Sequence, residues 1–327
     1  MNNRITSIDY AKGLAIICVV MGHILYFDIY DQHTETSPLF KFIYSFHMPL
    51  FFFLSGLVVS FTPKSFCDAF SDLEKRFLQL IMPMLIIGGV FTLVSGENVS
   101  SVLTSDMKSG YWYLEVLFFY YVIVRFCEMF FFKIRLFWGQ RMTITLIIVL
   151  LVIWQLLLRG YHYLPQNIVS IFSLVQIQLY LPYFAAGVMM NSYKGVFHNQ
   201  WLLIGGSIVW CMSTMFQFHY ILHVVCVLAS VLALMCVCVI FDRHEGQLKQ
   251  LMCYLGRNTL YIYCFHYFMV HLMDFSFIGD WLKGNQNIVL EMITCIIPTV
   301  LAIIGPLFMK EVVLSSSFLS KLVFNKK

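Results

Sequence analysis

The sequence predicts an all-α integral membrane protein, a bundle of about ten transmembrane helices with its N- and C-termini in the cytoplasm. Hydrophobic residues make up 60% of the 327 positions and charged residues only 12%, whereas a soluble domain has roughly half and a quarter. The apolar residues also lie in long blocks, each near the ~20 residues that a helix needs to cross a ~30 Å hydrocarbon core. The chain is therefore expected to fold in lipid.

Ten apolar blocks are the expected spans, and together they form one membrane-embedded domain over residues 1–327. His219 and Tyr220 are almost the only break between the seventh and eighth blocks, so either a tight turn or a single re-entrant element fits there. The blocks lie near residues 8–27, 40–61, 77–95, 111–132, 142–158, 168–190, 201–218, 220–241, 252–273 and 287–309.

Basic residues predict the orientation, because cytoplasmic loops carry an excess of Lys and Arg. Of the 21 Lys and Arg residues, fifteen fall in the loops on the side of the two termini. The opposite loops carry Lys41, Lys108, Arg159 and Lys283. Both termini are therefore expected in the cytoplasm. The net charge of +4 belongs to these loops and does not indicate a nucleic-acid partner.

The ten cysteines lie mostly within the spans, without the paired spacing of metal ligands. We interpret them as small apolar packing residues and expect no metal site.

Ionisable residues are rare within the spans. A charged side chain at the centre of a bilayer costs ~3 kcal/mol or more, so each such residue indicates a partner or a function. Among them are Asp9, Lys12 and His23 in the first span, His47 in the second, Glu115 in the fourth, and Arg257, His266 and His271 in the ninth.

Three of these residues form a polar stripe on the first span. Positions eleven apart on an α-helix differ by only about 20° around its axis, so Lys12 and His23 share a face, with Asp9 beside them. Lys12 is expected near the cytoplasmic entrance, and His23 lies ~16 Å further along the axis at ~1.5 Å per residue. Once the topology is assumed, His23, His47, Glu115 and His266 fall at a similar depth in the outer half.

Each of these residues also has a structural interpretation. His47 precedes Pro49 closely enough to bond a carbonyl freed by the proline. His266 is suited to an interhelical hydrogen bond, and Glu115 to partnering one of the histidines. Tyr111 and Trp112 are typical of membrane-interface anchors as well as of sugar-stacking residues.

The first two spans resemble signatures of the membrane acyltransferase-3 family. Residues 9–23, in which ten residues separate Lys12 from His23, resemble its opening signature, and residues 46–56 resemble its second. Looser matches follow at residues 75–83, 112–114 and 255–266. The family usually has arginine at the position of Lys12, and lysine lacks the planar fork of arginine for phosphate.

The resemblance implies transfer of an acyl group, usually acetyl from acetyl-CoA, to a hydroxyl of a cell-surface polysaccharide or its lipid-linked precursor. It implies a multi-pass protein of the bacterial inner membrane in contact with lipid, with His23 as the catalytic base. We expect Glu115 or His47 to orient the His23 ring, and Lys12, Arg76 and Arg257 to hold the phosphates of acetyl-CoA. The expected substrate-binding residues are Asp9, Ser55, Tyr111, Trp112 and His266.

Two other functions fit a polar interior. One is a glycan exporter or flippase without acyl-transfer chemistry, and the other is a proton- or solute-coupled transporter whose histidines relay protons. Neither predicts basic and histidine residues at the spacing of a coenzyme arm, and no internal repeat of the kind common in transporters is evident.

Overall fold

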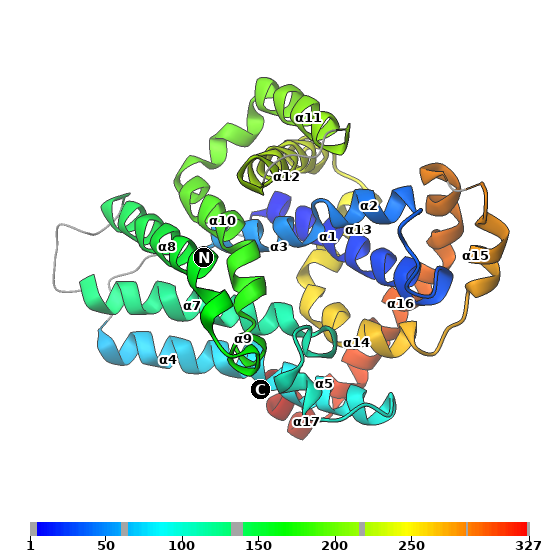
Figure 1. Ribbon diagram of the computed structural model, residues 1–327, viewed down its shortest axis with the longest axis horizontal. Coiled ribbons are helices and arrows are strands. Elements are labelled where there is room, and N and C mark those ends of the chain that lie inside the picture. The colour runs from blue at the N-terminus through cyan, green and yellow to red at the C-terminus, as the bar shows by residue number, and fades with distance from the viewer. Residues whose placement is uncertain (1–4, 60–64, 132–139, 216–219, 286, 326–327) are drawn as a thin grey trace. The chain divides into compact units, whose positions relative to one another are not determined.

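The computed structural model of the protein (Figure 1) describes residues 5–59, 65–131, 140–215, 220–285 and 287–325. The described residues form helices and no strand, which confirms the predicted all-α class. The chain divides into two compact units. Unit 1 contains residues 1–54 and 194–310, and unit 2 contains residues 55–193 and 311–327. That residues 1–327 form one membrane-embedded domain stays a prediction.

Unit 1 contains both ends of the predicted polar stripe. Its elements are α1 (Thr6–His23), the π-helix η1 (Ile24–Ile29), α2 (Pro38–Tyr44), most of α3 (His47–Leu57), α11 (Gln200–Met215), α12 (Tyr220–Asp242), α13 (Gln247–Arg257), α14 (Thr259–Val270), α15 (Ser276–Leu282) and most of α16 (Ile288–Ser315).

Unit 2 contains the third to sixth predicted spans. Its elements are α4 (Phe66–Arg76), the π-helix η2 (Phe77–Ile81), α5 (Met82–Val94), α6 (Ser101–Thr104), η3 (Lys108–Gly110), α7 (Trp112–Phe131), α8 (Gln140–Gly160), η5 (Tyr161–Tyr163), α9 (Gln166–Ile171), α10 (Leu174–Met190) and α17 (Ser317–Phe324), and η6 (Asn191–His198) runs across its boundary.

Helices α1 and α13 pack backbone to backbone in unit 1. A Cβ atom on Gly13 would collide with the Met252 carbonyl, and one on Gly256 would collide with the Asp9 carbonyl. Small residues at a helix crossing allow such close approach, which is the usual way helices associate in membranes. The helix that carries Lys12 and His23 is therefore held along its N-terminal half.

Helices α11 and α12 lie side by side (Figure 1). Gly206 of α11 contacts α12, where a Cβ atom would lie 2.7 Å from the Ala229 carbonyl oxygen. Residues 216–219, which include His219, lie outside the described residues. The ends of the predicted spans 40–61, 111–132 and 201–218 also lie partly outside them.

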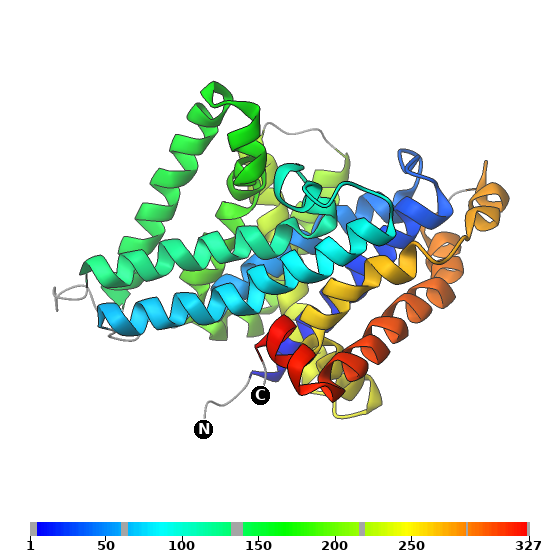
Figure 2. The ribbon, with the colours of Figure 1, turned by 90° about the horizontal axis from the view of Figure 1, so that it is seen from below.

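In unit 2, α7 packs along α4, and Figure 2 shows the two helices side by side. The ring of Tyr120 on α7 packs on Phe184 of α10, and its hydroxyl donates to the Ile177 carbonyl at 2.8 Å. Helix α7 thus packs on α4 and, through Tyr120, on α10.

Six helical segments among the described residues are long and apolar enough to cross a membrane. On α16, Ile293, Ile297, Leu301 and Phe308 share one face and are each at least 47% exposed, an apolar surface that suits lipid better than water. The six segments are Thr6–Ile29, Pro38–Leu57, Phe66–Val94, Met142–Tyr163, Tyr220–Asp242 and Ile288–Ser315. Shorter apolar helices lie at Leu174–Met190, Gln200–Cys211 and Thr259–Val270. The count of ten spans and the cytoplasmic termini stay predictions.

Three predicted spans that were expected to be single helices are interrupted within the described residues, and one of them, at 40–61, divides between α2 and α3. The span at 252–273 breaks at Asn258, whose side-chain amide donates to the Tyr254 carbonyl and competes with the backbone ladder. The span at 168–190 breaks before α10, where Ser173 adopts a left-handed conformation (φ 46°). Local polar side chains therefore divide blocks that look continuous by composition.

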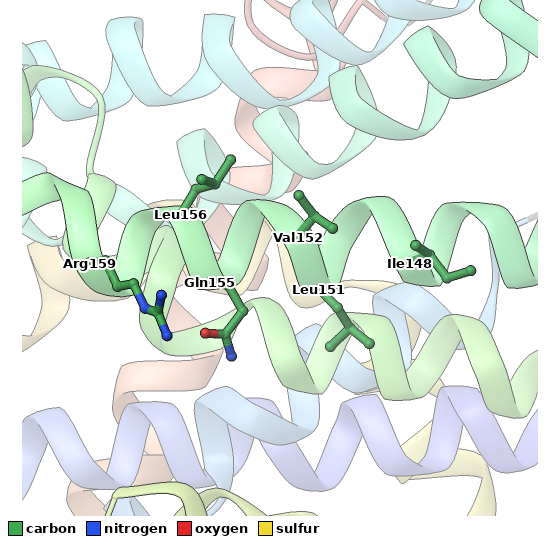
Figure 3. Close-up of a pocket in the computed structure, with 6 residues that line it drawn as sticks. All are labelled: Ile148, Leu151, Val152, Gln155, Leu156 and Arg159. Atoms are coloured by element: carbon green, nitrogen blue, oxygen red, sulfur yellow. The ribbon is translucent and has the colours of Figure 1, made fainter.

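A shallow pocket lies along α8 and contains none of the predicted site residues. Figure 3 shows its lining side chains, all from this one helix. They are Ile148, Leu151, Val152, Gln155, Leu156 and Arg159.

A buried glutamate that the sequence analysis did not single out joins α16 to the start of α2. Glu291 is fully buried. Its Oε1 accepts the Tyr30 hydroxyl at 2.6 Å, and its Oε2 accepts the Ser37 hydroxyl at 3.0 Å and the Leu39 amide at 2.8 Å. The carboxylate thus caps α2 together with Ser37, a position where helices favour negative charge.

We expect Gly256→Ala to lower the stability of the protein, because the added methyl group meets rigid backbone at Asp9. Overpacking of this kind typically costs ~1–3 kcal/mol. The measurement is the thermal unfolding midpoint of the purified protein in detergent. Gly205→Ala on α11, where a Cβ atom meets nothing within 4 Å, is the control. An unchanged midpoint for Gly256→Ala would contradict the close α1–α13 contact.

We expect Glu291→Gln to destabilise the protein, because an amide has a single acceptor oxygen for the three donors that the carboxylate satisfies. Leaving a buried donor unsatisfied costs ~1–3 kcal/mol. Thermal unfolding in detergent checks this, with Glu311→Gln, at an exposed position of α16, as the control. Equal midpoints for the two variants would show that Glu291 does not stabilise the α2 end.

Candidate active site

His23 is the last residue of α1, and the helix changes its pitch directly after it. η1 begins at Ile24, and the Tyr30 amide bonds to the Leu25 carbonyl five residues earlier at 3.0 Å. Single π-helical turns are rare and often lie at functional sites. A second π-helix, η2, begins directly after Arg76. Both π-helices thus directly follow a residue with a predicted functional role, His23 or Arg76.

Three rings from η1 and α14 lie against the His23 imidazole. The hydroxyl of Tyr267 lies 3.1 Å from its Nε2. The His266 ring lies 5.2 Å away between centroids, and the Phe27 ring stacks at 5.9 Å. His23 itself is half-buried. The structure thus brings His23 and His266, predicted at a similar depth, into contact within unit 1.

The ring of His266 is held in one tautomer by its own helix. This residue is fully buried, and its Nδ1 lies 2.8 Å from the Tyr263 carbonyl and 3.2 Å from the Ile262 carbonyl. A nitrogen facing carbonyl oxygens must carry the proton, so Nε2 keeps its lone pair. Within the described part of the chain, this Nε2 has no hydrogen-bond partner. His266 therefore presents an unoccupied acceptor.

His47 is held in the same way on α3. Its Nδ1 lies 2.8 Å from the Ile43 carbonyl, and its ring packs edge-on against Tyr44 at 4.6 Å. His47 thus bonds a backbone carbonyl, but this is the Ile43 carbonyl and not that of Ser45, the carbonyl that Pro49 leaves without its helical donor. Its predicted role in orienting His23 stays a prediction.

The other end of the stripe lies at the α1–α13 crossing. Lys12 is half-buried and Asp9 is buried, and the backbone of Asp9 contacts Gly256, the neighbour of Arg257. The side chain of Arg257, at the end of α13, is exposed. Because α1 is a continuous α-helix from Thr6 to His23, the predicted rise of ~16 Å between Lys12 and His23 stands.

Five predicted site residues belong to unit 2. Arg76 lies over the Tyr121 ring with its Cζ 4.5 Å from the centroid, and Ser55 lies 3.3 Å from the Tyr113 hydroxyl. Tyr111 is fully buried beside Phe91. Trp112 is 7% exposed and stacks on Tyr180 at 5.1 Å. The contacts of Tyr111 and Trp112 are packing contacts, and their assignment to sugar binding stays a prediction.

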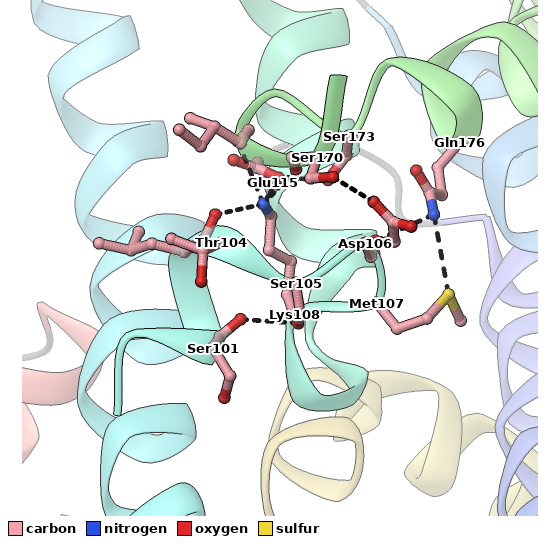
Figure 4. Close-up of polar contacts among 12 residues, drawn as sticks. Ser101, Thr104, Ser105, Asp106, Met107, Lys108, Glu115, Ser170, Ser173 and Gln176 are labelled. Carbon is pink, nitrogen blue, oxygen red and sulfur yellow. Dashed lines mark hydrogen bonds and ion pairs between the residues drawn. The ribbon is translucent and has the colours of Figure 1, made fainter. Parts of the chain in front are cut away.

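Glu115, the fifth of these, belongs to a buried polar network drawn in Figure 4. Its Oε2 accepts the Ser173 hydroxyl at 2.5 Å and lies 3.7 Å from the Lys108 ammonium. Lys108 is fully buried and also donates to the carbonyls of Leu103, Ser170 and Ile171 at 2.5–3.1 Å. Burial lowers the pKa of Lys108, and the carboxylate of Glu115 opposes this shift.

This network holds three of its residues in a strained backbone conformation. Lys108, Ser109 and Ser173 all have positive φ (49°, 49° and 46°), which non-glycine residues adopt only where surrounding contacts enforce it. Glu115 was expected to partner a histidine, and its partners within unit 2 are Lys108 and Ser173. Its predicted role beside His23 stays a prediction.

A family profile described as an acyltransferase domain matches residues 5–307 of the chain. The chain belongs to this acyltransferase family. The family resemblance predicted from residues 9–23 and 46–56 is therefore confirmed. The matched residues include every predicted site residue of the acyltransferase domain, from Asp9 to His266.

Two relatives of this acyltransferase-family chain are nodulation proteins named NolL. The one from Mesorhizobium japonicum is 35% identical over 138 residues, which are 38% of this chain and 36% of the relative. The one from Sinorhizobium fredii is 48% identical over 89 residues, which are 26% of this chain and 23% of the relative. The matched segments thus span about a third and a quarter of these relatives. No solved structure matches the chain.

Tyr267, Lys108 and Glu291 were missed as site or network residues. Tyr267 lies in an aromatic run with Tyr261 and Tyr263, and no spacing along the helix marks it as the partner of His23. Lys108 looked like an ordinary loop lysine, although its side chain is fully buried. A signal did exist for Glu291, which is an acidic residue inside the predicted span at 287–309.

Proposed function

We propose that the protein is an O-acyltransferase that moves an acetyl group from acetyl-CoA to a hydroxyl of a cell-surface polysaccharide or its lipid-linked precursor. One observation carries this proposal. In a chain of the acyltransferase family, α1 ends in a histidine whose ring is enclosed by polar and aromatic groups. The proposed location is the bacterial inner membrane, crossed by ten spans with both termini in the cytoplasm.

The donor binds from the cytoplasmic end in this proposal. Lys12 and Arg257, from helices that pack together, supply positive charge for the phosphates of acetyl-CoA. The pantetheine arm follows the stripe on α1. The ~16 Å between Lys12 and His23 is comparable to the length of that arm, and this supports the proposal that the thioester binds at His23.

The chemistry at His23 is general base catalysis. The neutral imidazole takes the proton of the acceptor hydroxyl while the hydroxyl oxygen attacks the thioester carbonyl carbon. The tetrahedral intermediate then expels the coenzyme thiolate, which recovers the proton from the imidazolium, so an ester and a free thiol are the products. A positioned base of this kind typically contributes ~10²–10⁴ in rate.

His266 is suited to bind the acceptor. Its bare Nε2 accepts a hydrogen bond from a sugar hydroxyl and lies in the ring cluster around His23. A buried acceptor that pairs only with substrate gives such a site its preference for hydroxylated ligands.

We expect His23→Ala to abolish acyl transfer while leaving expression and the thermal midpoint close to the wild type. The measurement is the mass of the purified surface glycan, which shows its acetyl content, from cells with each variant. His162→Ala, an exposed histidine of η5, is the control. Wild-type acetylation in His23→Ala would refute the base assignment.

The same preparation separates an enzyme from an exporter or transporter. Purified protein is expected to bind and slowly hydrolyse acetyl-CoA in a manner that depends on Lys12 and His23. Acetyl-CoA turnover equal to that of a protein-free control would favour a transport function.

We expect Lys12→Ala to raise the KM for acetyl-CoA about tenfold or more with a small change in kcat, because the lost charge contacts the donor away from the reacting atoms. Lys12→Arg is expected to retain activity, since arginine also binds phosphate. Lys41→Ala, at an exposed lysine of α2, is the control. A loss in kcat alone for Lys12→Ala would contradict the donor-binding role.

A further inference from the structure

The two nitrogens of the His23 ring have different surroundings. Nε2 lies 3.1 Å from the Tyr267 hydroxyl. Nδ1 is buried and has no hydrogen-bond partner among the described residues. Tyr267 is 5% exposed on α14, and its ring centroid lies 4.8 Å from that of His23. The hydroxyl is therefore held against one nitrogen by the packing of both rings.

Two proton arrangements are compatible with this contact. If Tyr267 donates to Nε2, the ring proton sits on Nδ1, where it is a buried N–H without an acceptor. If Tyr267 accepts from Nε2–H, then Nδ1 keeps a bare lone pair. Orphaned buried N–H groups are rarer than unfilled acceptors, and an unsatisfied donor costs ~1–3 kcal/mol. The second arrangement is therefore favoured.

Only the second arrangement also leaves a usable base. In the first, the lone pair on Nε2 accepts the Tyr267 hydroxyl, and Nδ1 already carries a proton. In the second, Nδ1 carries the lone pair and has no hydrogen-bond partner among the described residues, so the acceptor hydroxyl donates directly to Nδ1. The tautomer needed for catalysis and the tautomer favoured by hydrogen bonding are thus the same.

We propose that Tyr267 is a positioning residue that holds His23 in its Nε2–H tautomer, so that Nδ1 is the atom that takes the proton of the acceptor hydroxyl. This inference rests on the proposed function of His23 as the base. The arrangement has the form of a catalytic triad, in which a third group orients the base.

A tyrosine suits this role inside a membrane. A buried carboxylate, the usual third group, carries a charge that is costly to remove from water. The phenol is neutral and still accepts a hydrogen bond. When Nδ1 becomes protonated, the bond from Nε2–H becomes charge-assisted and stronger, which stabilises the imidazolium as it forms.

The neighbouring His266 provides an internal reference. Its tautomer is fixed by two backbone carbonyls and not by Tyr267, so it carries its proton on Nδ1. His23 and His266 should therefore show opposite tautomers although their rings lie 5.2 Å apart.

The first experiment measures the tautomer by NMR of the full-length protein labelled with ¹⁵N-histidine in detergent micelles. The His23 and His266 signals are assigned from the spectra of His23→Gln and His266→Gln. We expect a protonated Nε2 and a bare Nδ1 for His23 in the wild type, and a mixture of tautomers in Tyr267→Phe. A protonated Nδ1 in the wild type, or an Nε2–H signal unchanged in Tyr267→Phe, would overturn the inference.

The second experiment measures kinetics. Tyr267→Phe keeps the buried ring and is expected to lower kcat by about 10- to 100-fold, a part of the ~10²–10⁴ that a positioned base contributes, with the KM for acetyl-CoA unchanged. Tyr261→Phe, a buried tyrosine of the same helix whose ring faces Lys310, is the control and is expected to retain wild-type kcat.

The two experiments distinguish failure of this inference from failure of the proposed function. Wild-type transfer by His23→Ala would reject the base and the inference with it. Loss of activity in His23→Ala together with wild-type kcat in Tyr267→Phe would reject only the role of Tyr267.

Discussion

The absence of water in the hydrocarbon core is the constraint on which the structure depends, since a buried polar group there must find its partners within the protein. Glu291 meets this constraint with three donors, and Lys108 with three carbonyls and Glu115. Among the buried atoms of the described residues that lack a partner, two are ring nitrogens of adjacent histidines, His23 and His266. Hydrogen-bonding capacity is thus left open where the proposed substrate binds.

Close packing and chemistry are combined on one helix. Gly13 of α1 lies against the Met252 carbonyl of α13, and Gly256 of α13 lies against the Asp9 carbonyl of α1. The N-terminal half of α1 therefore has little freedom to rotate. An unbroken α-helix then carries that fixed orientation to His23. The proposed site at the C-terminal end of α1 is in this way aligned with Lys12 near its N-terminal end.

The sequence predicted what periodicity and composition determine, and missed what depends on contacts between distant residues. The helical class and the shared face of Lys12 and His23 follow from apolar blocks and the helical repeat. The interruption at Asn258 depends on one side-chain bond to the preceding turn. The partner of His23 lies 244 positions away, and a tyrosine within an apolar run looks the same whether it packs or positions a base.

The π-helix after His23 allows the residues that follow it to be reoriented without a change in the residues that precede it. A π-turn holds one more residue than an α-turn, so its insertion or loss rotates everything that follows by about 100° and leaves everything before it in place. Phe27, within η1, stacks on His23 and also contacts the His271 ring. Members of the family that gain or lose this one residue would place different side chains beside His23 while keeping the proposed base and the proposed donor path along α1.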